Sequence, residues 1–145
     1  PQLLLNGRDY RGFGSIESEV TRLNTRPAGA HLALRTEKMA TTVRVTATAE
    51  LIAPGTGAAA LYVALYENNL ETEVKAGENS GHRLRHDYVV RTLLGPIPLA
   101  AGKATHWTGS IPVSKDWKIE DLGVAAFVQS ERSGEILQAV AKTPL

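Results

Sequence analysis

The most regular pattern in the chain is the stretch VRVTATAEL at residues 43–51. Val43, Val45 and Ala47 alternate with Arg44 and Thr46, and this period of two is typical of a β-strand with one buried face. Clear or partial alternation recurs at residues 32–35, 61–66, 86–94, 105–113, 122–129 and 135–141, with a short edge strand expected at 72–75. The chain beyond residue 27 is therefore mainly β, with about seven or eight short strands.

These strands are expected to form an antiparallel β-sandwich, Ig-like or similar, because no helical pattern separates them. Two packed sheets bury the apolar faces that one open sheet leaves in water. A small closed barrel buries them equally well and is the alternative. Pro96 and Pro98 have no backbone N–H, so they end their strand or place it at an edge.

Residues 1–27 follow a different pattern. Residues 2–13 predict a β-hairpin, because an apolar run is followed by the turn-forming dipeptide Asn6-Gly7. Ser15 is suited to cap a helix in which Ile16, Val20 and Leu23 form one apolar stripe. We predict a boundary here, with residues 1–27 and 28–145 as separate units. The first unit is too small to bury a core alone.

Composition excludes several classes of function. The 145 residues fit one domain, or one domain plus a fragment. The net charge of +1 argues against a nucleic-acid binder that works by bulk charge, and no apolar run is long enough for membrane insertion. The absence of cysteine removes disulfides and thiol chemistry. Neither an initiator Met nor a signal segment opens the sequence, so we expect a cut, processed or engineered start.

The densest polar stretch, residues 67–91, is acidic in its first part and basic in its second. One interpretation is that neighbouring strands exchange cross-strand ion pairs. The other is a binding surface at the Gly77–Gly81 loop and the strand after it, with Glu78, Asn79, His86 and Arg91 as its candidate residues.

Catalytic and metal sites are not predicted. His82 and His86 lie four residues apart, which in a strand separates them by about 13 Å, too far to share one metal ion. No serine lies in a nucleophile-elbow pattern, and chance explains the carboxylate pairs that fifteen acids provide. We expect no cofactor, and we expect Trp107 and Trp117 to pack in the core and loops.

Three strings carry a resemblance to a known family: PQLLLNGR at residues 1–8, GENSGHRLRHDYVVR at 77–91, and AFVQ with ILQA at 126–129 and 136–139. They resemble an uncharacterised family of secreted bacterial thioredoxin-like proteins in which a β-sandwich follows the thioredoxin part. The resemblance implies that residues 1–27 are the C-terminal remnant of a thioredoxin-like domain. It also implies that Pro1 lies beside the redox site, opposite a Cys-x-x-Cys pair that would lie upstream.

The resemblance implies a periplasmic or secreted, non-catalytic accessory domain that holds the redox domain and contacts client proteins. The alternative function is a stand-alone peptide- or ligand-binding module that uses the surface from Gly77 to Arg91. In either case the apolar side chains of residues 1–25 need cover. We expect them to pack back on the sandwich or to pair with a second copy in a homodimer.

Overall fold

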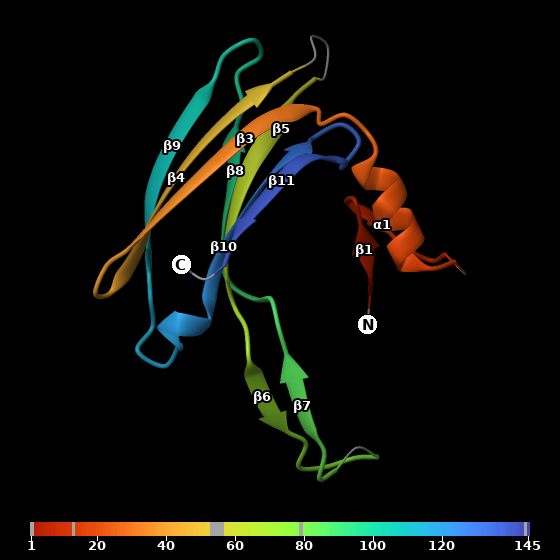
Figure 1. Cartoon of the computed structure of the whole chain (residues 1–145), viewed down its shortest axis with the longest axis vertical. Helices are drawn as coiled ribbons and strands as arrows, with labels where there is room; N and C mark the ends of the chain where they lie inside the picture. The colour runs from red at the N-terminus through yellow and green to blue at the C-terminus, as the bar shows by residue number, and fades with distance from the viewer. Residues whose placement is uncertain (1, 13, 53–56, 79, 144) are drawn as a thin grey trace.

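The alternating stretch at residues 43–51 lies at the centre of a three-stranded antiparallel sheet in the computed structural model, which describes residues 2–12, 14–52, 57–78, 80–143 and 145. This sheet has the order β3-β4-β9 (Figure 1). Its strands are β3 (Ala30–Lys38), β4 (Thr42–Leu51) and β9 (Thr105–Pro112). In the register Ala47 lies opposite Leu34 on one side and Trp107 on the other.

A second sheet of four antiparallel strands packs against the first, in the order β11-β10-β5-β8. Its strands are β5 (Ala59–Glu67), β8 (Val89–Pro98), β10 (Leu122–Ser130) and β11 (Ile136–Lys142). A short 3-10 helix, η1 (Ile119–Asp121), leads into β10. As the prolines predict, β8 lies at an edge.

The core lies between the two sheets and consists of the inward side chains of the alternating stretches. Its fully buried members come from five strands: Ala30 of β3, Val43, Val45, Ala47 and Ala49 of β4, Leu61, Val63 and Leu65 of β5, Ile111 of β9, and Leu122, Val124, Ala126 and Val128 of β10. The predicted mainly-β sandwich is confirmed. The barrel alternative is wrong, because the strands form two separate sheets rather than one closed ladder.

The outer face of β5 is covered by aromatic rings. Tyr62 stacks on Phe127 of β10 with ring centroids 5.1 Å apart. Tyr66 packs against Tyr88 at 5.4 Å and lies across Gly123, where an added Cβ would come within 2.4 Å of the Tyr66 ring. These rings lie over the two middle strands of the sheet, β5 and β10. β8 forms one of its two edges.

The predicted hairpin and helix both form at the N-terminal end. The hairpin comprises β1 (Leu4–Leu5) and β2 (Arg8–Asp9), and the helix is α1 (Ile16–Asn24). The side chain of Ser15 accepts a hydrogen bond from the Ser18 amide, as a helix cap should. The predicted boundary at residue 27 lies between α1 and β3 and stays a prediction.

A two-stranded ribbon, β6 (Leu70–Glu73) with β7 (Arg83–His86), projects from one end of the sandwich, as Figure 1 shows. We call it the arm. The single strand expected at residues 86–94 is therefore wrong. The chain breaks at Asp87 and Tyr88, and Tyr88 has a left-handed backbone with φ 57°. Within the described ranges, no helix has the length and apolar character needed to cross a bilayer.

Candidate functional site

The root of the arm contains the one ion pair of the described residues whose carboxylate is almost fully buried. Glu67, the last residue of β5, is 1% exposed, and its Oε2 accepts a hydrogen bond of 2.8 Å from Nε of Arg91. Its Oε1 accepts a second bond of 3.0 Å from the Lys118 amide. The Arg91 guanidinium lies 5.6 Å from the ring centroid of Trp117. Because both carboxylate oxygens are engaged, Glu67 fixes the loop that carries Trp117.

Two asparagines fix the direction in which the arm leaves the sandwich. Asn68 Oδ1 accepts a 2.9 Å bond from the Tyr88 amide, and the Asn69 amide donates a 2.8 Å bond to Oδ1 of Asp87. Asn69 Nδ2 also donates to Oδ1 of Asp121 at 2.7 Å. Asn69 has a left-handed backbone with φ 55°, a conformation that asparagine tolerates better than most residues. These bonds bind the arm to the end of the four-stranded sheet.

One face of the arm carries paired charges. The Arg83 guanidinium lies 3.3 Å from the Glu71 carboxylate and 3.4 Å from that of Glu73. The prediction of cross-strand ion pairs is thus confirmed here and at Glu67. The arm pairs are exposed, so each contributes about 0.2 to 1 kcal/mol at most.

The candidate binding residues do not converge on one site. Glu78 lies in the turn at the tip of the arm, and His86 ends β7 with its side chain exposed. Arg91 lies beyond the arm in β8 and is bound to Glu67. Asn79, like Pro1, lies outside the described residues. As binding residues they stay predictions, and they are spread along a ribbon rather than gathered in a pocket.

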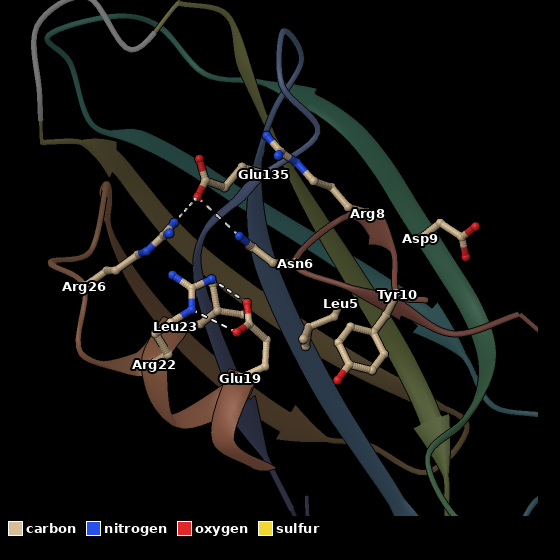
Figure 2. A pocket seen from close by; sticks show the side chains of 10 residues that line it. All are labelled: Leu5, Asn6, Arg8, Asp9, Tyr10, Glu19, Arg22, Leu23, Arg26 and Glu135. Carbon is tan, nitrogen blue, oxygen red and sulfur yellow. Dashed lines mark hydrogen bonds and ion pairs between the residues drawn. The ribbon is translucent and has the colours of Figure 1, made fainter. Parts of the chain in front are cut away.

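A cavity of about 440 Å³ lies where the hairpin and α1 meet the loop between β10 and β11 (Figure 2). Its walls are strongly charged. They contain three arginines and three acids, namely Arg8, Arg22, Arg26, Asp9, Glu19 and Glu135. Leu5, Leu23 and Tyr10 contribute the less polar part of the lining. Sequence patterns did not predict this cavity.

Polar contacts from the β10–β11 loop hold the cavity together. Asn6 Nδ2 donates to Oε1 of Glu135 at 3.2 Å, and the Ile136 amide donates to Asn6 Oδ1 at 2.9 Å. Arg26 also lies 3.1 Å from the Glu135 carboxylate. We call the Asn6–Glu135–Ile136 contact the latch. The residues it joins are about 130 positions apart in the sequence, so only the folded chain reveals the contact.

On the helix side of the cavity, Arg22 donates hydrogen bonds to the Glu19 carboxylate, which lowers the pKa of Glu19. The same interaction raises the pKa of Arg22. At the helix start, the hydroxyl of Ser15 lowers the pKa of Glu17 by hydrogen bonding to it. These groups are exposed, so they favour a local helix rather than a reactive site.

The structure also shows where the two tryptophans and the possible metal-binding side chains lie. Trp107 and Trp117 pack against the core, as expected. In the part of the chain that the structure describes, no three His, Asp or Glu side chains gather as metal ligands would.

Sequence reasoning missed the latch and the asparagine pair. For the pair, the visible signal was Asn-Asn directly after an apolar strand, since asparagine is common where the chain turns.

Comparison with known proteins identifies the family. The sequence profile of the family described as "Protein of unknown function (DUF1223)" matches residues 1–129. The chain belongs to this family. None of the curated proteins with which the sequence was compared matches it.

Two solved structures share the fold. HBP35 of Porphyromonas gingivalis has a TM-score of 0.68 and 19% identity, over 88% of this chain and 44% of that chain. A domain of the outer membrane lipoprotein Omp28 from Porphyromonas gingivalis has a TM-score of 0.53 and 16% identity, over 79% and 86% of the two chains. At such identities the likeness shows the fold alone. This chain spans less than half the length of the HBP35 chain.

Proposed function

We propose that this chain is a non-catalytic β-sandwich accessory domain of an exported thioredoxin-like protein, and that residues 1–27 join it to the redox domain. The observation that carries the proposal is the incomplete packing of the hairpin and helix. Leu3, Leu4 and Val20 are exposed, and no residue of α1 is buried. Such apolar faces need cover, and a further domain directly upstream is in the right place to cover them.

The latch gives the hairpin and helix a fixed position on the sandwich. Asn6, Glu135 and Ile136 make polar contacts there, while Leu3, Leu4 and Val20 stay exposed. Such a connector is anchored to the sandwich by polar bonds, and its exposed apolar side can bind a second domain. It can therefore hold the two domains in a fixed relative position. The greater length of the HBP35 chain supports the presence of a second part in proteins of this fold.

The chemistry of the buried residues supports a non-catalytic role. Glu67 is the most buried acid of the described residues, and both its carboxylate oxygens are taken by Arg91 and the Lys118 amide. A general acid or base must lie within hydrogen-bond reach of its substrate, and Glu67 is only 1% exposed. Glu67 instead has the partners of a structural anchor.

We infer a periplasmic or secreted location for the longer protein. The similar Omp28 domain comes from an outer membrane lipoprotein, which supports a place in the bacterial envelope. Fractionation of bacteria expressing the complete gene should place the protein in the periplasmic or medium fraction. Recovery only in the cytosol would contradict this.

The test of the main proposal is the coding sequence upstream of residue 1 and the longer protein it encodes. We expect about 100 further residues, the size of one domain, with a Cys-x-x-Cys pair. In the longer protein the α1 amides should exchange with solvent more slowly than in the 145-residue chain. The amide of Ile52, another exposed apolar residue, serves as the control and should not change. An upstream region without paired cysteines, or α1 exchange that stays the same, would refute the proposal.

A second candidate function is a peptide-binding module that uses the surface from Gly77 to Arg91. The arm favours it, because this ribbon projects from the sandwich and both of its strands are exposed (Figure 1). Its rigid root at Asn68 and Asn69 would present it to a partner in one orientation.

A further inference from the structure

In the sheets formed by the described residues, no strand pairs with the outer side of β7 or of β8. β8 is the outer strand of the four-stranded sheet, and β7 is one of two strands in the arm. β7 leads into β8 with the register kept, Leu70 opposite His86 and Glu67 opposite Val89, so the two outer sides lie in series and form a border that is interrupted only at Asp87 and Tyr88. A strand border presents unpaired N–H and C=O groups, to which another strand can bind.

The β8 part of this border is apolar and exposed. Tyr88 is 70% exposed, Val90 55% and Leu93 56%. Edge strands are usually protected by charged residues, proline or β-bulges. β8 has prolines only after Leu94 and a register shift at Arg91, and Arg91, the one charged residue from 89 to 94, is held by Glu67. Val90 and Leu93 stay exposed beside it.

The β7 part of the border is basic. Arg83 shares the carboxylates of Glu71 and Glu73 at 3.3 and 3.4 Å. Arg85 donates to the side-chain oxygen of Asn69 and, among the described residues, makes no ion pair with a carboxylate. In the register Arg85 lies opposite Glu71, whose carboxylate is paired with Arg83, so an acid of a ligand can bind Arg85 without breaking an ion pair.

We propose that this border, residues 83–94, binds an extended peptide of a partner protein as an added antiparallel strand. Antiparallel pairing sets the order of the peptide: apolar alternating residues come first and lie against β8, and acidic residues follow and lie against β7. The proposal deepens the peptide-binding candidate function and rests on it. It is independent of the proposed redox partner.

A second copy of this chain fits the border less well than such a peptide. If two copies pair antiparallel about Leu84, Arg83 of one copy lies opposite Arg85 of the other. If they pair about the middle of the 89–94 stretch, Arg85 in β7 lies opposite Pro98, which has no N–H to donate. An acidic, apolar peptide avoids both conflicts.

The test is a titration of the ¹⁵N-labelled 145-residue chain with the peptide Thr-Val-Thr-Val-Thr-Val-Gly-Ser-Thr-Glu-Thr-Glu, followed by amide chemical shifts. We expect saturable shifts at residues 83–94. The same peptide in reverse order should bind at least about fivefold more weakly, because its acids then face β8. No shift at millimolar peptide, shifts centred on β9, or equal binding of the reversed peptide would overturn the proposal.

Variants separate the two parts of the border. The double variant Val90→Lys with Leu93→Lys should weaken binding at least about tenfold, since lysine blocks strand addition. Ile52→Lys, at a comparably exposed apolar residue away from the border, should leave it within about twofold. Arg85→Gln should weaken binding of the Glu peptide but not of its Gln counterpart. Equal effects of the border and control variants would overturn the proposal. A dimer in sedimentation experiments, with β8 amides protected from hydrogen exchange, would also overturn it.

Discussion

At the scale of single residues, the strongest individual contacts lie at the ends of strands rather than in the middle of the core. Glu67 is the clearest example, because a carboxylate that is almost fully buried needs partners for both oxygens. Arg91 and the Lys118 amide provide them. The sequence showed Glu67 only as one acid among several, since its burial follows from the position of a loop some fifty residues later.

Glu67→Gln should destabilise the protein by about 2 kcal/mol, because it removes a charged hydrogen bond and leaves Arg91 without its partner. Arg91 keeps some access to water, being 29% exposed, which limits the loss. Urea unfolding measures the change. Glu37→Gln is the control, since its pair with Arg44 is exposed and should contribute less than about 0.5 kcal/mol. Equal losses in the two variants would contradict the assignment of Glu67 as an anchor.

Gly7→Ala should open the latch. An alanine Cβ at this position would come within 1.8 Å of the Gly134 carbonyl oxygen, which belongs to the backbone and has little room to move. We expect the Ile136 amide, which donates to Asn6, to exchange faster while the sandwich stays folded. Gly57→Ala is the matched control, because Gly57 has nearly the same φ, +77° against +75°, and nothing within 4 Å of the added Cβ. Protection of Ile136 that is unchanged in Gly7→Ala would count against the latch.

At the scale of elements, each strand and the helix form for local reasons, but the breaks between them depend on distant partners. The helix at residues 16–24 follows from a cap and an apolar stripe that the sequence displays. The break of the 86–94 pattern at Tyr88 does not, because it depends on hydrogen bonds to Asn68 and Asn69 across the arm root. Periodicity describes which way side chains alternate, and it carries no information on such junctions.

Asn69 should control the order of the arm root. Asn69→Ala loses the side-chain bonds to Asp121 and from Arg85 and strains the left-handed backbone, whereas Asn69→Gly loses only those bonds. We expect Ala to cost about 1 kcal/mol more than Gly. Amide exchange at residues 83–86, measured in both variants, reports the difference. If Ala and Gly behave alike, backbone strain does not contribute at this position.

The stability of α1 should depend on acid pH. A carboxylate whose pKa is lowered by folding stabilises the folded form above its unfolded pKa, and this contribution is lost as the pH falls through the folded pKa. Glu19, hydrogen bonded by Arg22, and Glu17, hydrogen bonded by Ser15, are such groups. We therefore expect the ¹³Cα shifts of α1 to move toward coil values between about pH 6 and pH 3. Glu19→Gln should flatten this change, and a profile that stays as steep would contradict the role of Glu19.

At the scale of the whole molecule, the sandwich could be predicted and the functional surface could not. Alternation at residues 43–51, 61–66 and 122–129 predicted buried strands, and these strands form the core. The four candidate residues between Glu78 and Arg91 are near in sequence, yet the described ones are spread from the tip of the arm to β8. Nearness along a projecting ribbon does not gather side chains. The cavity at the latch escaped prediction for the opposite reason, because Asn6 and Glu135 are about 130 positions apart in the sequence.

The central claim is that the sandwich carries the stability of this chain and that the hairpin and helix are an incompletely packed attachment. Native-state hydrogen exchange of the 145-residue chain tests it most directly. Amides of β4, β5 and β10 should exchange only when the whole protein unfolds, so their opening free energy should be about 5 to 15 kcal/mol. Amides of α1 should open at less than about 2 kcal/mol, as a nine-residue helix with no buried residue requires. If α1 shared the protection of the sandwich strands, the claim would be contradicted.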